Sequence, residues 1–93
     1  MTLDEIAARI RAGLERKPLD RSLCFDCGDD GALLLQDTNV TRADGPADCT
    51  IRISQSNLSK LVQGNLNPMT AFAMGKLKVS GDMSVALKLG QLL

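Results

Sequence analysis

The segment SGDMSVALKLGQLL, residues 80–93, constrains the fold of this chain more than any other stretch. A helix that begins at Asp82 has polar side chains only on a narrow stripe formed by Ser84, Lys88 and Gln91. Most of the remaining circumference is apolar, whereas a surface helix normally has an apolar face of about a third of its circumference. Such a helix must be covered on two sides, by a sheet on one and by another helix, a second subunit or an apolar ligand on the other.

An ordinary amphipathic helix at the start of the sequence shows how unusual that segment is. Thr2 and Glu5 match a capping box, and Pro18 ends the helix. Its charged side chains lie off an apolar stripe that consists of Leu3, Ile6, Ile10 and Leu14. The helix of residues 80–93 therefore requires a second partner to cover its apolar surface, whereas the first helix does not.

Strand patterns follow the first helix. Residues 22–27 and 32–37 alternate as strands around the turn sequence GDDG, which predicts a β-hairpin. Residues 38–43 can form a short edge strand, and residues 49–54 and 76–80 have the alternation of half-buried strands. Hairpin strands followed by helices indicate an α+β fold with a roughly five-stranded, mainly antiparallel sheet and helices packed on one face.

Two helices are expected between the last two strands. Ser54 or Ser56 can cap the first of them. The second starts at Pro68, directly after the N-cap Asn67, and Gly75 ends it. The length of 93 residues suits a single domain over residues 1–93.

Composition argues against catalysis. The chain has no His, which removes the usual metal ligand and the base of Ser–His and Cys–His pairs. It contains neither a P-loop nor a dinucleotide-binding glycine motif. With no catalytic constellation, we expect no enzymatic activity and no cofactor.

Two motifs have only a superficial likeness to metal or redox sites. Cys24 and Cys27 have CxxC spacing, but they lie in an expected strand, where residues three apart point to opposite faces. Residues 26–37 resemble a calcium loop, yet Gly28 takes the third ligand position and Asp37 replaces the bidentate Glu. We expect inert thiols, no metal, and a hairpin turn.

Charge is balanced overall and uneven locally. Eleven basic residues offset eleven acidic ones, so nothing draws the chain to nucleic acid. Residues 26–48 hold six acids against Arg42 (net −5), and residues 49–93 hold five basic residues against Asp82 (net +4). The cationic part allows transient contact with an anionic membrane, or it is simply a solvated surface.

We expect a cytoplasmic protein that is a monomer. This expectation follows from the odd number of cysteines, the absence of a secretory pattern and the absence of an 18-residue apolar run.

Residues 47–89 resemble the sterol carrier protein type 2 family. The segments ADCTI, GNLNPMTAF, GKLKVSGDM and ALKL are similar, in order and spacing, to that family's central strand, short helix, last strand and final helix. Residues 1–46 match in layout only. The resemblance implies a sheet and helices that enclose a hydrophobic tunnel for fatty acyl chains, acyl-CoA, sterols or isoprenoid lipids. The sequence ends without the C-terminal extension of longer members, and this short form resembles bacterial ones.

The resemblance also implies which residues contact the lipid. Phe25, Leu33, Ile51 and Ile53 would form the sheet wall, and Lys76, Lys78 or Lys88 could hold a carboxylate or phosphate at the mouth. The expected tunnel lining is Leu58, Leu61, Val62, Met69, Phe72, Ala73, Leu77, Val79, Met83, Ala86 and Leu87.

The predicted function is non-enzymatic binding and intracellular transfer of an apolar lipid. The alternative is an accessory scaffold that docks a partner enzyme, for example of lipid or quinone biosynthesis, through its apolar helices. A redox or zinc protein that uses Cys24 and Cys27 is a third alternative.

Overall fold

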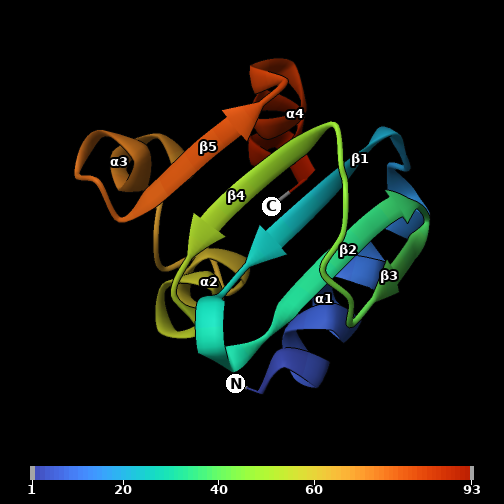
Figure 1. Ribbon diagram of the computed structural model, residues 1–93, viewed down its shortest axis with the longest axis horizontal. Coiled ribbons are helices and arrows are strands. Elements are labelled where there is room, and N and C mark those ends of the chain that lie inside the picture. Colours follow the sequence, from blue (N-terminus) through green and yellow to red (C-terminus); the bar gives the residue numbers. More distant parts are fainter. Residues whose placement is uncertain (1, 93) are drawn as a thin grey trace.

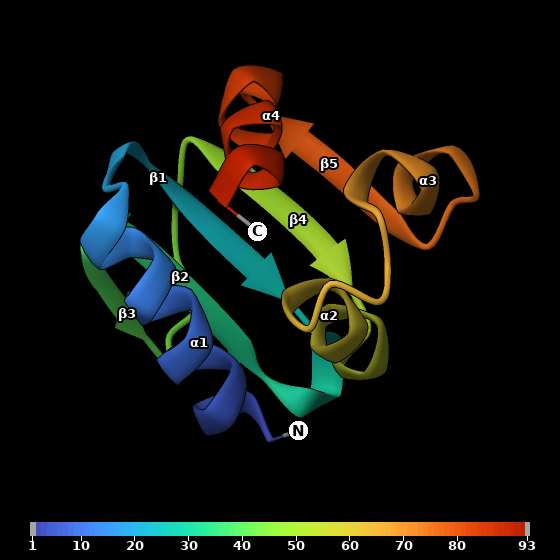
Figure 2. The ribbon, with the colours of Figure 1, turned by 180° about the vertical axis from the view of Figure 1, so that it is seen from behind.

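A computed structural model describes residues 2–92 of the chain. One five-stranded sheet carries helices α1, α2 and α4 on the same face, and α3 lies beside the edge strand β5 (Figures 1 and 2). The expected α+β architecture is confirmed. No helix in the described range is long and apolar enough to cross a membrane. The strands are β1 (Leu19–Asp26), β2 (Ala32–Asp37), β3 (Asn39–Thr41), β4 (Cys49–Ile53) and β5 (Leu77–Gly81).

The strand order is β3-β2-β1-β4-β5, and one of its pairs was not expected. Strands β1 and β2 pair antiparallel, as the hairpin pattern predicted. The pairs β2/β3 and β4/β5 are also antiparallel, whereas β4 pairs parallel to β1. The predicted edge strand β3 returns along β2, and residues 42–48 then cross the helix-free face of the sheet to enter β4 beside β1 (Figure 1). This crossover gives the apolar strand β1 a neighbour on both sides, and its Leu23 and Phe25 are fully buried.

Local capping explains where the first three helices begin. Helix α1 (Leu3–Arg16) has the predicted capping box, in which the Glu5 N–H donates to Thr2 Oγ1 at 3.2 Å. Helix α2 (Gln55–Val62) is capped by Ser54, whose Oγ accepts from the Asn57 N–H at 3.1 Å. Helix α3 (Pro68–Ala73) starts after Asn67, whose side-chain oxygen accepts from two backbone N–H groups.

The core lies between one face of the sheet and helices α1, α2 and α4. Strand side chains that point to the helices are buried, while Arg52 and Lys78 on the opposite face are exposed. This half-buried pattern is why the strands alternate in sequence. The largest fully buried side chains are Phe25, Ile6, Ile10, Leu14, Leu23, Leu33, Leu35, Leu58, Leu61, Val85 and Cys24.

Helix α4 (Met83–Leu92) covers strands β1, β4 and β5. Its Val85 is buried against the core, whereas Met83 and Leu87 remain 47% and 58% exposed. The sheet therefore covers one apolar side of this helix, and these two side chains of the other side stay partly open to solvent.

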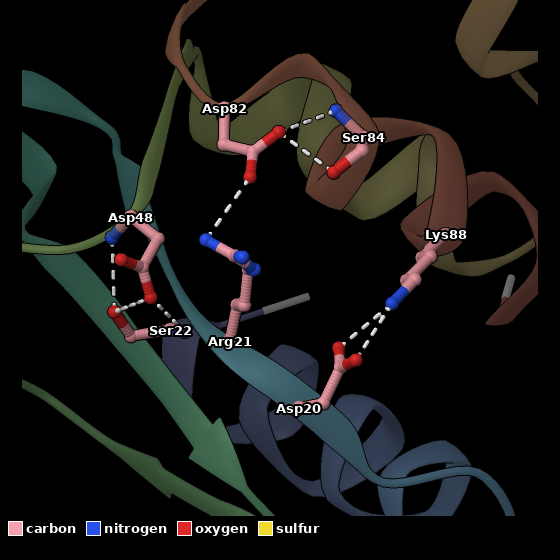
Figure 3. A network of polar contacts seen from close by, with 7 residues as sticks. All are labelled: Asp20, Arg21, Ser22, Asp48, Asp82, Ser84 and Lys88. Carbon is pink, nitrogen blue, oxygen red and sulfur yellow. Dashed lines mark hydrogen bonds and ion pairs between the residues drawn. The ribbon is translucent and has the colours of Figure 1, made fainter.

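Polar contacts hold α4 to the start of β1 (Figure 3). Lys88 Nζ lies 2.8 Å from both carboxylate oxygens of Asp20, and Arg21 lies 3.4 Å from Asp82. The Lys88 contact lowers the pKa of Asp20, and hydrogen bonds from Ser84 lower the pKa of Asp82. Thus Lys88, on the polar stripe of the helix, is paired with a strand carboxylate while it remains exposed to solvent.

Candidate functional site

An apolar cavity of about 100 Å³ lies on the helix side of the sheet, between its β4–β5 edge and helices α2, α3 and α4. The strands supply its floor through side chains that alternate inward. Helix α3 stands at its mouth because Asn67 and Pro68 start a short helix directly after the turn that follows α2. The lining residues are Ile51, Leu61, Pro68, Met69, Phe72, Leu77, Val79, Met83, Ala86 and Leu87.

Most of the predicted lining residues lie around this cavity. Eight of the eleven do so: Leu61, Met69, Phe72, Leu77, Val79, Met83, Ala86 and Leu87.

Three predicted lining residues lie elsewhere. Leu58 is fully buried in the core, and Val62 packs partly buried against that core. Ala73, at the end of α3, is exposed. Leu58 and Leu61 share the buried face of α2, but only Leu61 borders the cavity.

Fewer residues of the sheet border the cavity than the sequence predicted. Of its four predicted residues only Ile51 borders the cavity, since Phe25, Leu33 and Ile53 are enclosed in the core. Pro68 lines the cavity although its pattern indicated only a helix start. The cavity thus borders the β4–β5 edge of the sheet rather than the whole expected sheet wall.

The mouth of the cavity is formed by large apolar side chains that water can reach. Met69, Phe72, Met83 and Leu87 are between 47% and 64% exposed. Methionine is flexible and polarizable, so this rim can adapt to ligands of different shape. Exposed apolar side chains gathered at a cavity mouth are typical of a binding site.

None of the three cysteines lines this cavity, and all three are free and buried. Burial raises the pKa of Cys24 and Cys49, and burial together with the Asp30 carboxylate raises the pKa of Cys27 to about 11. A raised pKa disfavours the thiolate, which is the form that attacks disulfides and binds metals. The environment of the CxxC pair therefore argues against redox chemistry.

We expect the folded protein to resist thiol alkylation. At pH 8 a thiol of pKa about 11 is about 0.1% thiolate, against about 24% for a free thiol. Iodoacetamide labelling followed by mass spectrometry should show Cys27 reacting at least about 100-fold more slowly than in urea-unfolded protein. A Cys27 that reacts in the folded protein as fast as in the unfolded one would contradict this.

Comparison with known proteins gives consistent matches. The family model described as the SCP-2 sterol transfer family matches residues 2–93. Sterol carrier protein 2 of Bos taurus is 50% identical over 53 residues, which are 57% of this chain and 10% of that protein. Peroxisomal multifunctional enzyme A of Dictyostelium discoideum is 46% identical over 44 residues, 47% of this chain and 10% of the enzyme. The chain thus matches about a tenth of the length of these curated relatives.

A solved structure has the same fold. Sterol Carrier Protein-2 from Aedes aegypti, in complex with the C16 fatty acid palmitate, superposes with a TM-score of 0.82. The match covers 98% of this chain and 93% of the other at 19% sequence identity.

Proposed function

This chain belongs to the SCP-2 sterol transfer family, and from that premise we propose that it binds one apolar lipid in the cavity and carries it without chemical change. The observation that carries this proposal is an apolar cavity whose mouth consists of half-exposed Met, Phe and Leu side chains. The palmitate in the Aedes aegypti structure supports a fatty acyl chain as the ligand class. No observation favours the scaffold alternative over this one.

The energetics suit a carrier. Burying about twelve methylenes at about 0.8 kcal/mol each gains roughly 10 kcal/mol. Lost freedom of ligand and protein on association offsets several kcal/mol of this. A remainder of about 6 kcal/mol corresponds to a dissociation constant of tens of micromolar, which is tight enough to hold a lipid and weak enough to release it.

A long chain requires the cavity to widen. Its volume of about 100 Å³ is smaller than the roughly 150 Å³ that holds a benzene molecule in an engineered cavity. Helix α3 has only six residues and packs mainly against the edge strand β5. We propose that α3 moves outward and that the half-exposed Met83 and Leu87 side chains turn aside to admit the chain, because α3 buries only Ala71 in the core.

The contact residues are the eight predicted side chains that surround the cavity, together with Ile51 and Pro68. Residues 1–93 would act as one monomeric domain, with transient contact to an anionic membrane during loading or release.

Titration with a fluorescent fatty acid tests the function. We expect saturable binding near one ligand per chain with a dissociation constant on the order of tens of micromolar. Native mass spectrometry of the purified protein, followed by organic extraction, should detect a co-purifying lipid. Absence of both saturable binding and bound lipid would overturn the carrier proposal, and light scattering would then show whether the exposed rim binds a second copy.

A further inference from the structure

Helix α3 lies at the outer edge of the molecule, beyond the edge strand β5 (Figures 1 and 2). Its Ala71 is buried, whereas Met69, Phe72 and Met74, at the helix or its C-cap, are 64%, 48% and 62% exposed. Ala73 is exposed as well. The outer surface of this short helix is therefore largely apolar. We call the four exposed side chains, Met69, Phe72, Ala73 and Met74, the apolar tip.

The lipid cavity accounts for only part of the apolar tip. Met69 and Phe72 line the cavity, but Met74 does not border it. Met74 follows Phe72 by two residues and extends the exposed apolar surface from the cavity mouth over the end of α3. A continuous apolar surface that water can reach marks a contact with a protein or a membrane. The exposure of Met74 thus indicates a contact outside the cavity.

Unpaired cations follow the apolar tip. Between Asp48 and Asp82 the chain has four basic residues and no acidic one. Two of them, Lys76 and Lys78, are exposed, and their ammonium groups have no ion-pair or hydrogen-bond partner among residues 2–92. Lys76 is held beside the tip because its backbone N–H donates to the carbonyl oxygen of Ala71 at 2.9 Å.

The position of β5 at the edge of the sheet lets these cations and the apolar tip contact one flat surface. Lys78 pairs with Arg52 and projects from the helix-free face, while the cavity lies on the helix face. A surface that meets the sheet at its edge can touch side chains from both faces of the last strand, and lysine has a long flexible stem. Asp26, which borders the same hollow as the two lysines, lies on β1, two strands from the edge, with its carboxylate 3.9 Å from the Arg52 guanidinium. The edge itself is therefore apolar and cationic.

An anionic membrane fits this combination better than a protein partner does. Phe, Leu and similar side chains enter the boundary between headgroups and acyl chains, and Lys side chains beside them are attracted to anionic lipid. Protein–protein interfaces are instead depleted of Lys and depend on Trp, Tyr and Arg. The chain has no Trp and no Tyr.

We propose that the apolar tip, together with Lys76 and Lys78, docks the protein on an anionic membrane. This assignment rests on the proposed function and names the surface through which the carrier meets the membrane. Because Met69 and Phe72 belong both to the tip and to the cavity lining, docking places the cavity mouth against the bilayer. A lipid then passes between the bilayer and the cavity without crossing bulk water.

Co-sedimentation with phosphatidylcholine vesicles that contain about 30% phosphatidylglycerol tests the docking surface. We expect the wild-type protein to bind these vesicles and Lys76→Gln/Lys78→Gln to bind them about 30-fold more weakly, since each cation near the surface contributes about fivefold. Met74→Gln should bind about fivefold more weakly, because an apolar contact with the bilayer is lost. Raising the salt concentration to about 0.5 M should weaken binding of the wild type more than binding of the double lysine variant.

Arg9→Gln/Arg16→Gln is the matched control. Both arginines are exposed on α1, which packs against β3 at the opposite edge of the sheet. The control removes two positive charges, as the lysine variant does, but far from the tip, where salt screens their effect on a membrane docked at β5. It should change vesicle binding less than about twofold. A loss equal to that of the lysine variant would show that overall charge or α1 governs binding, and would overturn the assignment.

Titration of the fluorescent fatty acid without vesicles separates this inference from the function on which it rests. Met74→Gln should keep its fatty acid affinity, since Met74 does not line the cavity. Normal fatty acid binding, combined with vesicle binding that neither tip variant weakens, would overturn the docking surface and leave the carrier function intact. Vesicle binding of the expected pattern without fatty acid binding would overturn the carrier function alone. If the wild type ignores vesicles and light scattering shows a dimer that Met74→Gln disrupts, the tip is a contact between copies and the membrane assignment is wrong.

Discussion

Replacing Gly81 by alanine is expected to destabilise the domain by about 3 kcal/mol or more, which lowers the melting temperature by roughly 12 °C or more. Gly81 has a φ of +89°, and a Cβ built on it would lie 2.4 Å from the backbone carbonyl oxygen of Asp48. Backbone atoms cannot move aside as a flexible side chain can. The same carbonyl accepts a hydrogen bond from the Asp82 N–H at 2.8 Å, just before α4 begins. Relief of the clash would therefore disturb both the β4–β5 pairing and the placement of α4.

Gly64→Ala separates this clash from the cost of the backbone conformation. Gly64 has a φ of +79° after helix α2, and no atom lies within 4 Å of a Cβ built there. Its replacement by alanine should lower the free energy of unfolding by only about 1–2 kcal/mol, which is the cost of holding a side-chain-bearing residue in the left-handed conformation. Thermal unfolding followed by circular dichroism measures both variants. Equal losses in the two would mean that the chain around Asp48 relaxes and that the close approach to Gly81 has no energetic consequence.

Local signals in the sequence predicted the elements of this fold well. Capping residues act within one turn, which is why Thr2, Ser54 and Asn67 are found at the helix starts that their patterns indicated. The alternation of apolar and polar residues also predicted which face of β4 is buried, and Cys49 and Ile51 lie on that face. These features depend on residues close in sequence, so one sequence suffices to find them.

Features that depend on distant residues were less predictable. The parallel pairing of β4 with β1 follows from where residues 42–48 cross the sheet, and turn patterns do not encode that path. The helical stripe on α2 correctly indicated that Leu58 faces inward, but periodicity cannot separate core from cavity. Arg52 and Lys78 likewise are far apart in sequence and become neighbours only through the register of β4 and β5.

The largest effect on ligand binding is expected from Met83→Asp. Met83 lines the cavity, is 47% exposed and is the first residue of α4. A carboxylate in the first turn of a helix is favourable to the helix, so the fold should persist. A bound acyl chain would lose the methionine contact and would have to lie against a charge, at a cost of about 2 kcal/mol, or about 30-fold in affinity. Titration of the fluorescent fatty acid measures this change.

Met74→Asp is the matched control for Met83→Asp. Met74 is a second exposed methionine, 62% accessible, that does not line the cavity, and its replacement makes the same chemical and charge change. If the cavity holds the lipid, Met83→Asp weakens binding about 30-fold and Met74→Asp changes it less than about twofold. Equal weakening in both variants would mean that the ligand lies across the outer surface of α3. The apolar character of helix α4 would then have to be explained by protein contact rather than by the lipid.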